Sequence, residues 1–196
     1  MLTDRQTRQD DGGFTLVELL VGSLLLVLVF VAIGGIMYSS QKTTILVATT
    51  TSATSAGQAV INSIETGVRN SENSLGMSVP LKLTNPTGSD QMLTGLVVGK
   101  SAAGTAQCDA WYYSATDGTI RKKVSSTAIA APTSSQLHSW SILASGITPI
   151  SGTTIFTFTT PTVSVAYKVD AGKDPAVPFS STFASRTGTT GTIACF

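Results

Sequence analysis

An apolar stretch of 24 residues near the N-terminus constrains this chain more than any other feature of its sequence. The stretch runs from Phe14 to Met37 and contains one ionisable side chain, Glu18. As an α-helix rising about 1.5 Å per residue it would extend roughly 36 Å, enough to cross the ~30 Å hydrocarbon core of a bilayer. A secretory signal would have a shorter apolar region and a small-residue cleavage site after it, and this sequence has neither. The stretch therefore predicts a membrane-spanning helix.

Charge and composition indicate which side of the membrane the rest occupies. Arg5 and Arg8 precede the stretch, whereas the first basic residue after it is Lys42. Basic flanking residues favour the cytoplasm, so we expect residues 1–13 inside and the C-terminal part outside.

Charged residues make up only 12% of the chain and its formal net charge is +1, which excludes a nucleic-acid binder that depends on a basic surface. The 30 Thr and 24 Ser fit an exported β-rich protein better than a cytosolic enzyme.

A specific motif marks the start of the apolar stretch. The run from Gly12 to Leu20, GGFTLVELL, resembles the class III signal of type IV pilins and of the pilin-like subunits of type II secretion and competence machines. The resemblance implies that residues 1–13 are a leader, which a prepilin peptidase removes after Gly13. It also implies a new N-terminus at Phe14 that is often methylated, and a role in assembly for Glu18, the fifth residue after the cut.

The energetics of Glu18 support a function for this carboxylate. A carboxylate at the centre of a spanning helix costs about 2.5–3.5 kcal/mol, and less near a helix end. The resemblance implies that Glu18 pairs with the free amine of Phe14 in a neighbouring subunit, so that the helices leave the bilayer and bundle in a filament core. The alternative is that Glu18 lies at the headgroup level of an ordinary single-pass anchor.

Helical periodicity continues beyond the membrane segment. One face would carry residues spaced by three and four positions, namely Leu46, Thr49, Ala53, Ala56, Val60, Ile64 and Val68. We expect residues 38–70 to continue the spanning helix 14–37, with this face on a sheet, and the helix to end within Asn70–Gly76. Many major pilins carry a proline at the position of Gly35. Gly34-Gly35 would either soften the helix or permit close helix packing.

Residues 77–196 are expected to form a β-rich exported domain. Alternating apolar runs predict strands at Met92–Val98, Ala110–Ser114, Thr119–Val124, Ile155–Thr160 and Val163–Val169. Asp117-Gly118 and Pro161-Thr162 predict turns, whereas Ser125–Gln136 and Asp170–Thr192 are expected to be loops. The expected fold class is α+β and pilin-like, with a long N-terminal helix packed on a small antiparallel sheet domain.

Residues 108 to 169 carry a second resemblance, to W-type minor pilins and J-type pseudopilins of type II secretion. It rests on the aromatic residues leading to Tyr113, on Asp117-Gly118 with Ile120-Arg121, on Trp140, and on Phe156-x-Phe158. The resemblance implies a minor subunit.

Cys108 and Cys195 are the two cysteines of the chain. Cysteines in an exported domain can pair, and this bond would tie the penultimate residue to the strand at Ala110–Ser114. The closed loop would be worth about 4–5 kcal/mol on the chain-entropy model. A disulfide near the C-terminus is also common in the type IV pilins that the chain resembles. The alternative is two free buried thiols.

The sequence offers little support for catalysis or metal binding. Outside the leader and the spanning segment it has seven carboxylates and one imidazole, His138, with no recognisable Ser-His-Asp order and no cluster at metal-ligand spacing. Asp170 and Asp174 lack the alternating oxygen ligands of a calcium loop, and Gly99-Lys100-Ser101 misses the phosphate-loop spacing. The basic run 121–123 is interpreted as a solvated strand face rather than a DNA contact. We therefore expect no enzyme activity, cofactor or metal.

These observations predict the precursor of a minor pilin or pseudopilin, a structural subunit that assembles through its N-terminal helix. The partners implied are a prepilin peptidase, other pilin subunits, a membrane platform protein with its ATPase, and membrane lipid before assembly; no nucleic acid is predicted. The protein would first span the cytoplasmic membrane once and then join a cell-surface or periplasm-spanning filament. The kind of filament stays open, whether pilus, DNA-uptake filament or secretion pseudopilus. The alternatives are an unpolymerised, membrane-anchored extracellular binding or adhesion module, and a secreted hydrolase, for which no clustered site is found.

Overall fold

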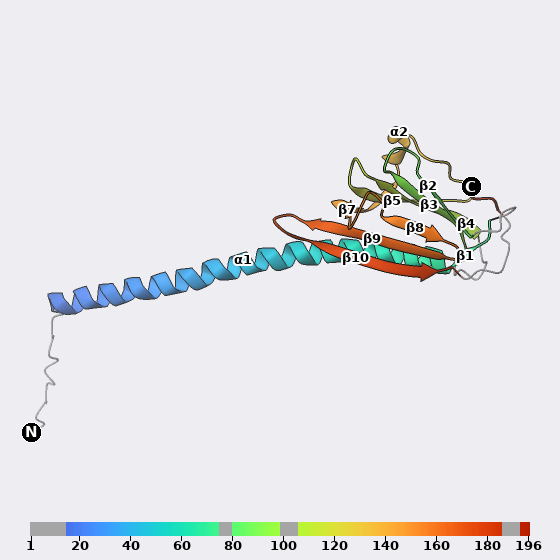
Figure 1. Cartoon of the computed structure of the whole chain (residues 1–196). Helices are drawn as coiled ribbons and strands as arrows, with labels where there is room; N and C mark the ends of the chain where they lie inside the picture. Colours follow the sequence, from blue (N-terminus) through green and yellow to red (C-terminus); the bar gives the residue numbers. More distant parts are fainter. Residues whose placement is uncertain (1–14, 75–79, 99–105, 186–192) are drawn as a thin grey trace, which may run out of the picture. The chain divides into compact units, whose positions relative to one another are not determined.

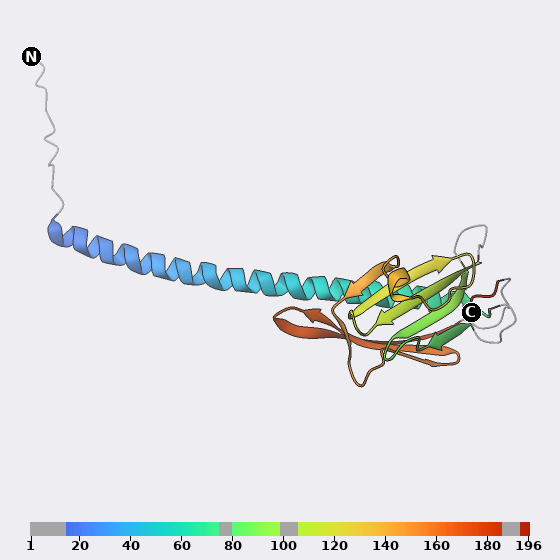
Figure 2. The ribbon, with the colours of Figure 1, turned by 90° about the horizontal axis from the view of Figure 1, so that it is seen from above.

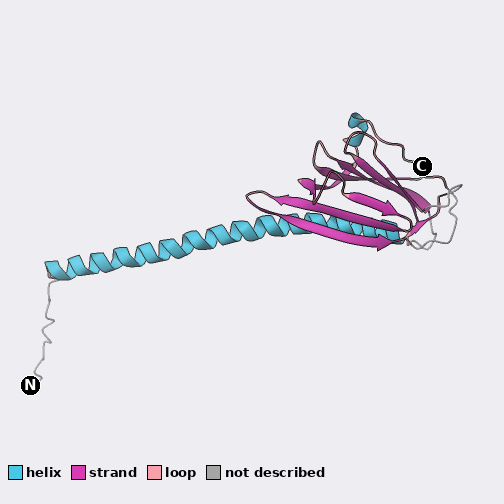
Figure 3. Cartoon of the chain, viewed as in Figure 1, coloured by secondary structure: helices cyan, strands magenta, loops and turns pink. Residues whose placement is uncertain are grey.

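The computed structural model describes residues 15–74, 80–98, 106–185 and 193–196. A long helix, α1 (Leu16–Arg69), is followed by strands and a short helix, α2 (Ser134–Leu137) (Figure 1; Figure 3 separates helices from strands). The strands are β1 (Ser71–Glu72), β2 (Leu81–Thr84), β3 (Gln91–Val98), β4 (Ala106–Ser114), β5 (Thr119–Ser125), β6 (Ser141–Ser145), β7 (Ile147–Pro149), β8 (Phe156–Thr159), β9 (Thr162–Ala171) and β10 (Asp174–Ala184). The chain divides into two units between Leu46 and Val47, and the two are described separately.

The first unit consists of the N-terminal part of α1. Residues 16–46 are all exposed, and the helix continues through Gly34-Gly35 without interruption. By length and composition, α1 is the one helix among the described residues that could cross a membrane. The helix expected from the sequence is therefore present and is long and apolar enough to span a membrane.

The second unit contains two antiparallel sheets (Figure 2). The six-stranded sheet has the order β1-β3-β4-β5-β6, with β2 also paired to β3; the four-stranded sheet has the order β10-β9-β7, with β8 also paired to β9. Both sheets pack on the part of α1 that belongs to this unit. The expected α+β class, a long helix packed on antiparallel sheet, is confirmed.

The main core lies between α1 and the two sheets. From the predicted helical stripe, Ala53, Val60, Ile64 and Val68 are buried, because their spacing places them on one face. They pack with residues of both sheets, including Trp111 of β4 and Tyr167 of β9. The Tyr167 hydroxyl donates to the Gly57 carbonyl of α1 at 2.7 Å, which satisfies a buried polar group at this interface.

A second core covers the opposite face of the six-stranded sheet. The side chains of β3 and β4 that point away from α1 form it, and the segment between β5 and β6 and the C-terminal residues cover them. Its buried members are Met92, Leu96, Cys108, Ala110, Tyr112, Ile129, Leu137, Trp140 and Cys195. Strand β3 is buried on both faces for this reason, which explains its nearly continuous apolar sequence.

One predicted loop is wrong. Asp170–Thr192 was expected to lack regular structure, but β9 extends to Ala171 and β10 pairs with almost all of β9 through a turn at Gly172-Lys173. Gly172 has φ +74°, a conformation that favours glycine. Pro175 and Pro178 lack the N–H that an inner strand needs, and they are tolerated because β10 is an edge strand. Residues 186–192 of the expected loop lie outside the described residues.

Candidate functional site

The residues expected to act in assembly lie at the N-terminus of the chain. Gly13 and Phe14, the expected cleavage and methylation positions, lie outside the described residues. Glu18 is in the first turn of α1 and is exposed. It is the one ionisable side chain between Thr15 and Met37. An exposed carboxylate on an otherwise apolar helix surface needs a cation or an N–H donor when that surface leaves water.

Thr15 caps the helix at this point. The backbone N–H groups of Glu18 and Leu19 donate to the Thr15 carbonyl at 3.0 and 3.2 Å, and the Glu18 N–H also lies 3.3 Å from the Thr15 hydroxyl oxygen. The spacing Thr15-x-x-Glu18 is that of a capping box, and a carboxylate in the first turn is stabilised by the helix dipole.

The cysteines join the end of the chain to the second unit. The structure pairs Cys108 with Cys195, with a Cα–Cα distance of 5.4 Å. Both residues are fully buried. Two hydrogen bonds hold the same segment: the Cys195 N–H donates to the Ser74 hydroxyl at 2.9 Å, and the Cys195 carbonyl accepts from the Ile129 N–H at 3.2 Å. The C-terminal residues are therefore part of the second core.

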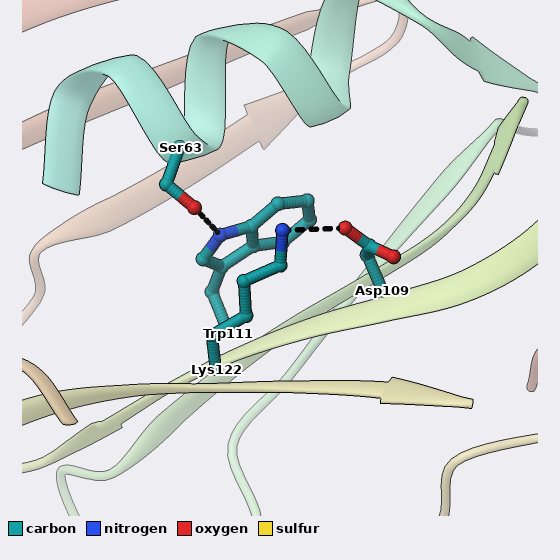
Figure 4. Close-up of polar contacts among 4 residues, drawn as sticks. All are labelled: Ser63, Asp109, Trp111 and Lys122. Atoms are coloured by element: carbon teal, nitrogen blue, oxygen red, sulfur yellow. Dashed lines mark hydrogen bonds and ion pairs between the residues drawn. The ribbon is translucent and has the colours of Figure 1, made fainter. Parts of the chain in front are cut away.

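Trp111 connects the six-stranded sheet to α1 (Figure 4). Its indole N–H donates to the Ser63 hydroxyl of α1 at 3.0 Å. The ring lies against Gly67, where a β-carbon would overlap it. The absence of a side chain at Gly67 thus allows the indole to approach the helix backbone directly.

Lys122 and Asp109 form an ion pair beside this indole (Figure 4). The Lys122 ammonium lies 2.7 Å from Asp109 Oδ2 and 5.2 Å from the centre of the Trp111 ring. The Asp109 side chain is 3% exposed and that of Lys122 is 25% exposed, while Asp109 Oδ1 has no hydrogen-bond donor among the described residues. The interpretation of residues 121–123 as a solvated strand face is therefore wrong for Lys122 and for the buried Arg121.

We predict that the two halves of this pair differ in their effect on stability. Lys122→Met leaves the Asp109 carboxylate buried without a cation and should cost about 3 kcal/mol, within the range for a stranded buried charge. Asp109→Asn should cost less, because the Lys122 ammonium still reaches water and the Trp111 ring. Urea unfolding of both variants measures the difference. A larger loss for Asp109→Asn would contradict this assignment.

Asp90, immediately before β3, makes structural contacts in the second unit. Asp90 accepts from the Tyr112 hydroxyl and from the Ala115 N–H, both at 2.7 Å. Burial, followed by the hydrogen bond and the charge of Asp90, raises the pKa of Tyr112 far above its usual value. His138 is exposed. Among the described residues, no group of three or more His, Cys, Asp or Glu side chains could hold a metal ion.

Asp170 and Asp174, at the turn between β9 and β10, each accept a hydrogen bond. Asp170 Oδ1 accepts from the Gly172 N–H at 2.9 Å, as expected in a turn. Asp174 Oδ2 accepts from the Thr49 hydroxyl of α1 at 2.6 Å. Gly99-Lys100-Ser101 lies outside the described residues.

The architecture, a long apolar N-terminal helix packed on antiparallel sheet, is pilin-like. Comparison of the chain with protein-family models, curated proteins and solved structures finds no match.

Proposed function

We propose that this chain is the precursor of a minor pilin or pseudopilin, cut after Gly13 and assembled into a filament through its N-terminal helix. The observation that carries the proposal is the exposed surface of α1 from Leu16 to Met37, which is almost wholly apolar and has Glu18 near its start. A surface of this kind is stable in a bilayer or against other apolar helices, and not in water. A filament core made of such helices would cover it.

Glu18 supports assembly rather than anchoring alone. Once the helix leaves the headgroup region, its carboxylate requires a cation within the apolar core. In the proposed filament, the free amine of Phe14 from a neighbouring subunit supplies that cation. The proposed partners are a prepilin peptidase, other pilin subunits, and a membrane platform protein with its ATPase.

The second candidate function is a permanently anchored extracellular module. The Thr15 cap favours it, because the Thr15 hydroxyl accepts from the Glu18 backbone N–H and α1 thus begins without a contact from a neighbouring subunit. The two functions predict different responses to removal of the Glu18 charge and to removal of the cap.

We expect Glu18→Gln to be processed like the wild type and to lose at least about 90% of its incorporation into filaments, because glutamine keeps the capping geometry without the charge. Glu18→Ala should behave in the same way. Thr15→Ala is the matched control, since it removes the capping hydroxyl and keeps the charge, and it should incorporate. The measurement is the amount of the protein in sheared or cross-linked filaments relative to the membrane fraction. Normal incorporation of Glu18→Gln would contradict the pairing of Glu18 with an amine.

The mass and N-terminal residue of the native protein test the processing step. The proposal requires a chain that begins at Phe14, with or without one methyl group on its amine. A chain that still carries residues 1–13, in cells with an active peptidase, would overturn the proposal and favour the anchored module.

A further inference from the structure

The edge strands of the two sheets differ in how they are protected against pairing with another chain. An edge strand presents unpaired N–H and C=O groups, and proteins protect such edges with proline, charge, short length or a covering group. Strand β10 carries Pro175 and Pro178, and β7 ends at Pro149. The Gln91 side chain covers β8, because its amide oxygen accepts from the Phe156 N–H at 2.9 Å and its amide nitrogen donates to the Phe156 carbonyl at 3.0 Å.

Strand β6 lacks these forms of protection. At the opposite edge of the six-stranded sheet, β1 is two residues long and β2 carries Lys82. Strand β6 has the sequence SILAS, with neither proline nor charge, and none of the described strands pairs with its outer side. Ile142 is 57% exposed. A register shift opposite β5 limits the length that an added strand can pair with, so further contacts beside β6 are needed for binding.

A groove of about 460 Å³ runs along the outer side of β6. Residues 142–145 of β6 and residues 169–172, from β9 and the turn after it, border this groove. Consecutive side chains of a strand point to opposite faces, so a groove bordered by four consecutive residues follows the edge of the strand. Helix α1 lines the groove with four small side chains, those of Thr49, Ser52, Ala53 and Ala56. Small side chains here leave room for those of a strand laid along β6.

One end of the groove is acidic and lies beside the C-terminal end of β6. The Asp170 N–H donates to the carbonyl of Gly146, the residue after β6, at 2.8 Å. Asp170 and Asp174 form no ion pair with a basic side chain in the part of the chain that the structure describes. Lys173, in the turn between them, offsets one of the two charges. One net negative charge remains at this end, and no residue that lines the groove is basic.

We propose that this groove binds an extended segment of another protein as an added strand, antiparallel to β6, with a lysine or arginine at the segment's N-terminal end. The backbone of the segment pairs with the N–H and C=O groups of β6 that face away from β5. Its apolar side chains lie over Ala53 and Ala56. An antiparallel strand places its N-terminal end beside Asp170, and the basic side chain there pairs with this carboxylate.

The charge of the groove favours a different protein over a second copy of this chain. Two copies paired through β6 would bring residues 138–146 of one copy to the groove of the other, and these residues include no lysine or arginine. The acidic end would then have no cation. The groove belongs to the second unit, and the proposal does not depend on the proposed filament function.

The test uses the full-length protein in detergent micelles and a fluorescent, terminally blocked peptide of sequence KVTVTV. Fluorescence anisotropy measures binding, and the absence of saturable binding up to about 1 mM would overturn the proposal. The peptide VTVTVK has the same composition with its lysine at the wrong end. It should bind about threefold more weakly, the effect of an exposed ion pair. Equal affinity of the two peptides would overturn the assigned direction and the pairing with Asp170.

Backbone methylation tests whether the peptide binds as a strand. One peptide carries N-methyl groups on its valine nitrogens and another on its threonine nitrogens. Only one of these alternating sets faces β6, so one of the two peptides should bind at least about tenfold more weakly than the other, the loss expected for one or two hydrogen bonds. Equal affinities of the two methylated peptides would overturn the added strand.

Two pairs of protein variants locate the site. Ser52→Phe places a ring in the groove and should weaken binding of KVTVTV at least about tenfold. Ser55→Phe is its control, because Ser55 is also exposed on α1 but does not line this groove. Asp170→Asn keeps an oxygen for the Gly172 N–H and should weaken binding about threefold, whereas Glu72→Gln, on β1 at the opposite edge of the sheet, should not.

Equal effects within either pair of variants would overturn the proposed site. Sedimentation of the protein alone provides the last measurement, with wild type and Ser52→Phe expected to have the same mass. A wild-type dimer that Ser52→Phe dissociates would show that a second copy occupies the groove, and would overturn the assignment to another protein.

Discussion

Replacing both Cys108 and Cys195 with alanine is expected to lower the free energy of unfolding of the second unit by about 4–5 kcal/mol. The disulfide joins residues separated by 87 positions, so its loss returns a long loop to the unfolded ensemble. Single domains are stable by only about 5–15 kcal/mol, and this change would therefore remove a large share of the total. Urea unfolding of the full-length protein in detergent, followed by tryptophan fluorescence, measures it.

Two controls accompany the cysteine variant. Reduction of the wild-type protein should produce a similar loss, because it breaks the same bond without removing the sulfur atoms. Ser74→Ala removes only the hydrogen bond to the Cys195 N–H and should cost about 1 kcal/mol. If the double cysteine variant is as stable as Ser74→Ala, the disulfide does not reduce the conformational entropy of the unfolded chain by the expected amount.

Gly67→Ala is expected to cost about 3 kcal/mol, the upper part of the usual range for overpacking. The new β-carbon would overlap the Trp111 ring. The ring is fully buried and its N–H is bound to Ser63 one helical turn away, so it cannot move aside without losing that bond. The same unfolding experiment measures the loss, and the fluorescence of Trp111 should report a wetter environment.

Other glycines of α1 provide the comparison for Gly67. Gly35→Ala meets no atom within 4 Å and should not destabilise the second unit, since alanine is the better helix former. Gly57→Ala would contact Phe179, which is only partly buried and can shift, so its cost should be smaller than that of Gly67→Ala. Gly67→Ala with wild-type stability would contradict the direct contact between the indole and the helix backbone.

Local patterns in the sequence were sufficient for much of the fold. The predicted strands at Met92–Val98 and Thr119–Val124 differ from β3 and β5 by one residue at one end, because alternation with period two and the Asp117-Gly118 turn are local properties. The stripe at Ala53, Val60, Ile64 and Val68 was visible for the same reason. Neither pattern depends on what the element later packs against.

Strand β10 was missed because its alternation is incomplete. The alternation of its inward side chains Val177, Phe179 and Phe183 is interrupted by Ser181, and its two prolines suggest a loop. Only the position of β10 at the edge of the sheet, beside β9, makes those prolines compatible with a strand. That position depends on the order of the strands, which spacing along the chain does not determine.

The spanning-capable helix follows from one uninterrupted apolar stretch, and the buried face of α1, several of the strands and the class of the fold follow from local periodicity, so all of them can be read from the sequence. The difference between Lys122 and Lys123, by contrast, is visible only in the folded chain. Both are lysines of one strand, yet one meets Asp109 and the indole bound to Ser63, and the other meets the Trp140 indole. The two lysines differ because the contacts of a side chain depend on residues far away in the sequence, which the pairing of strands and the docking of α1 bring together.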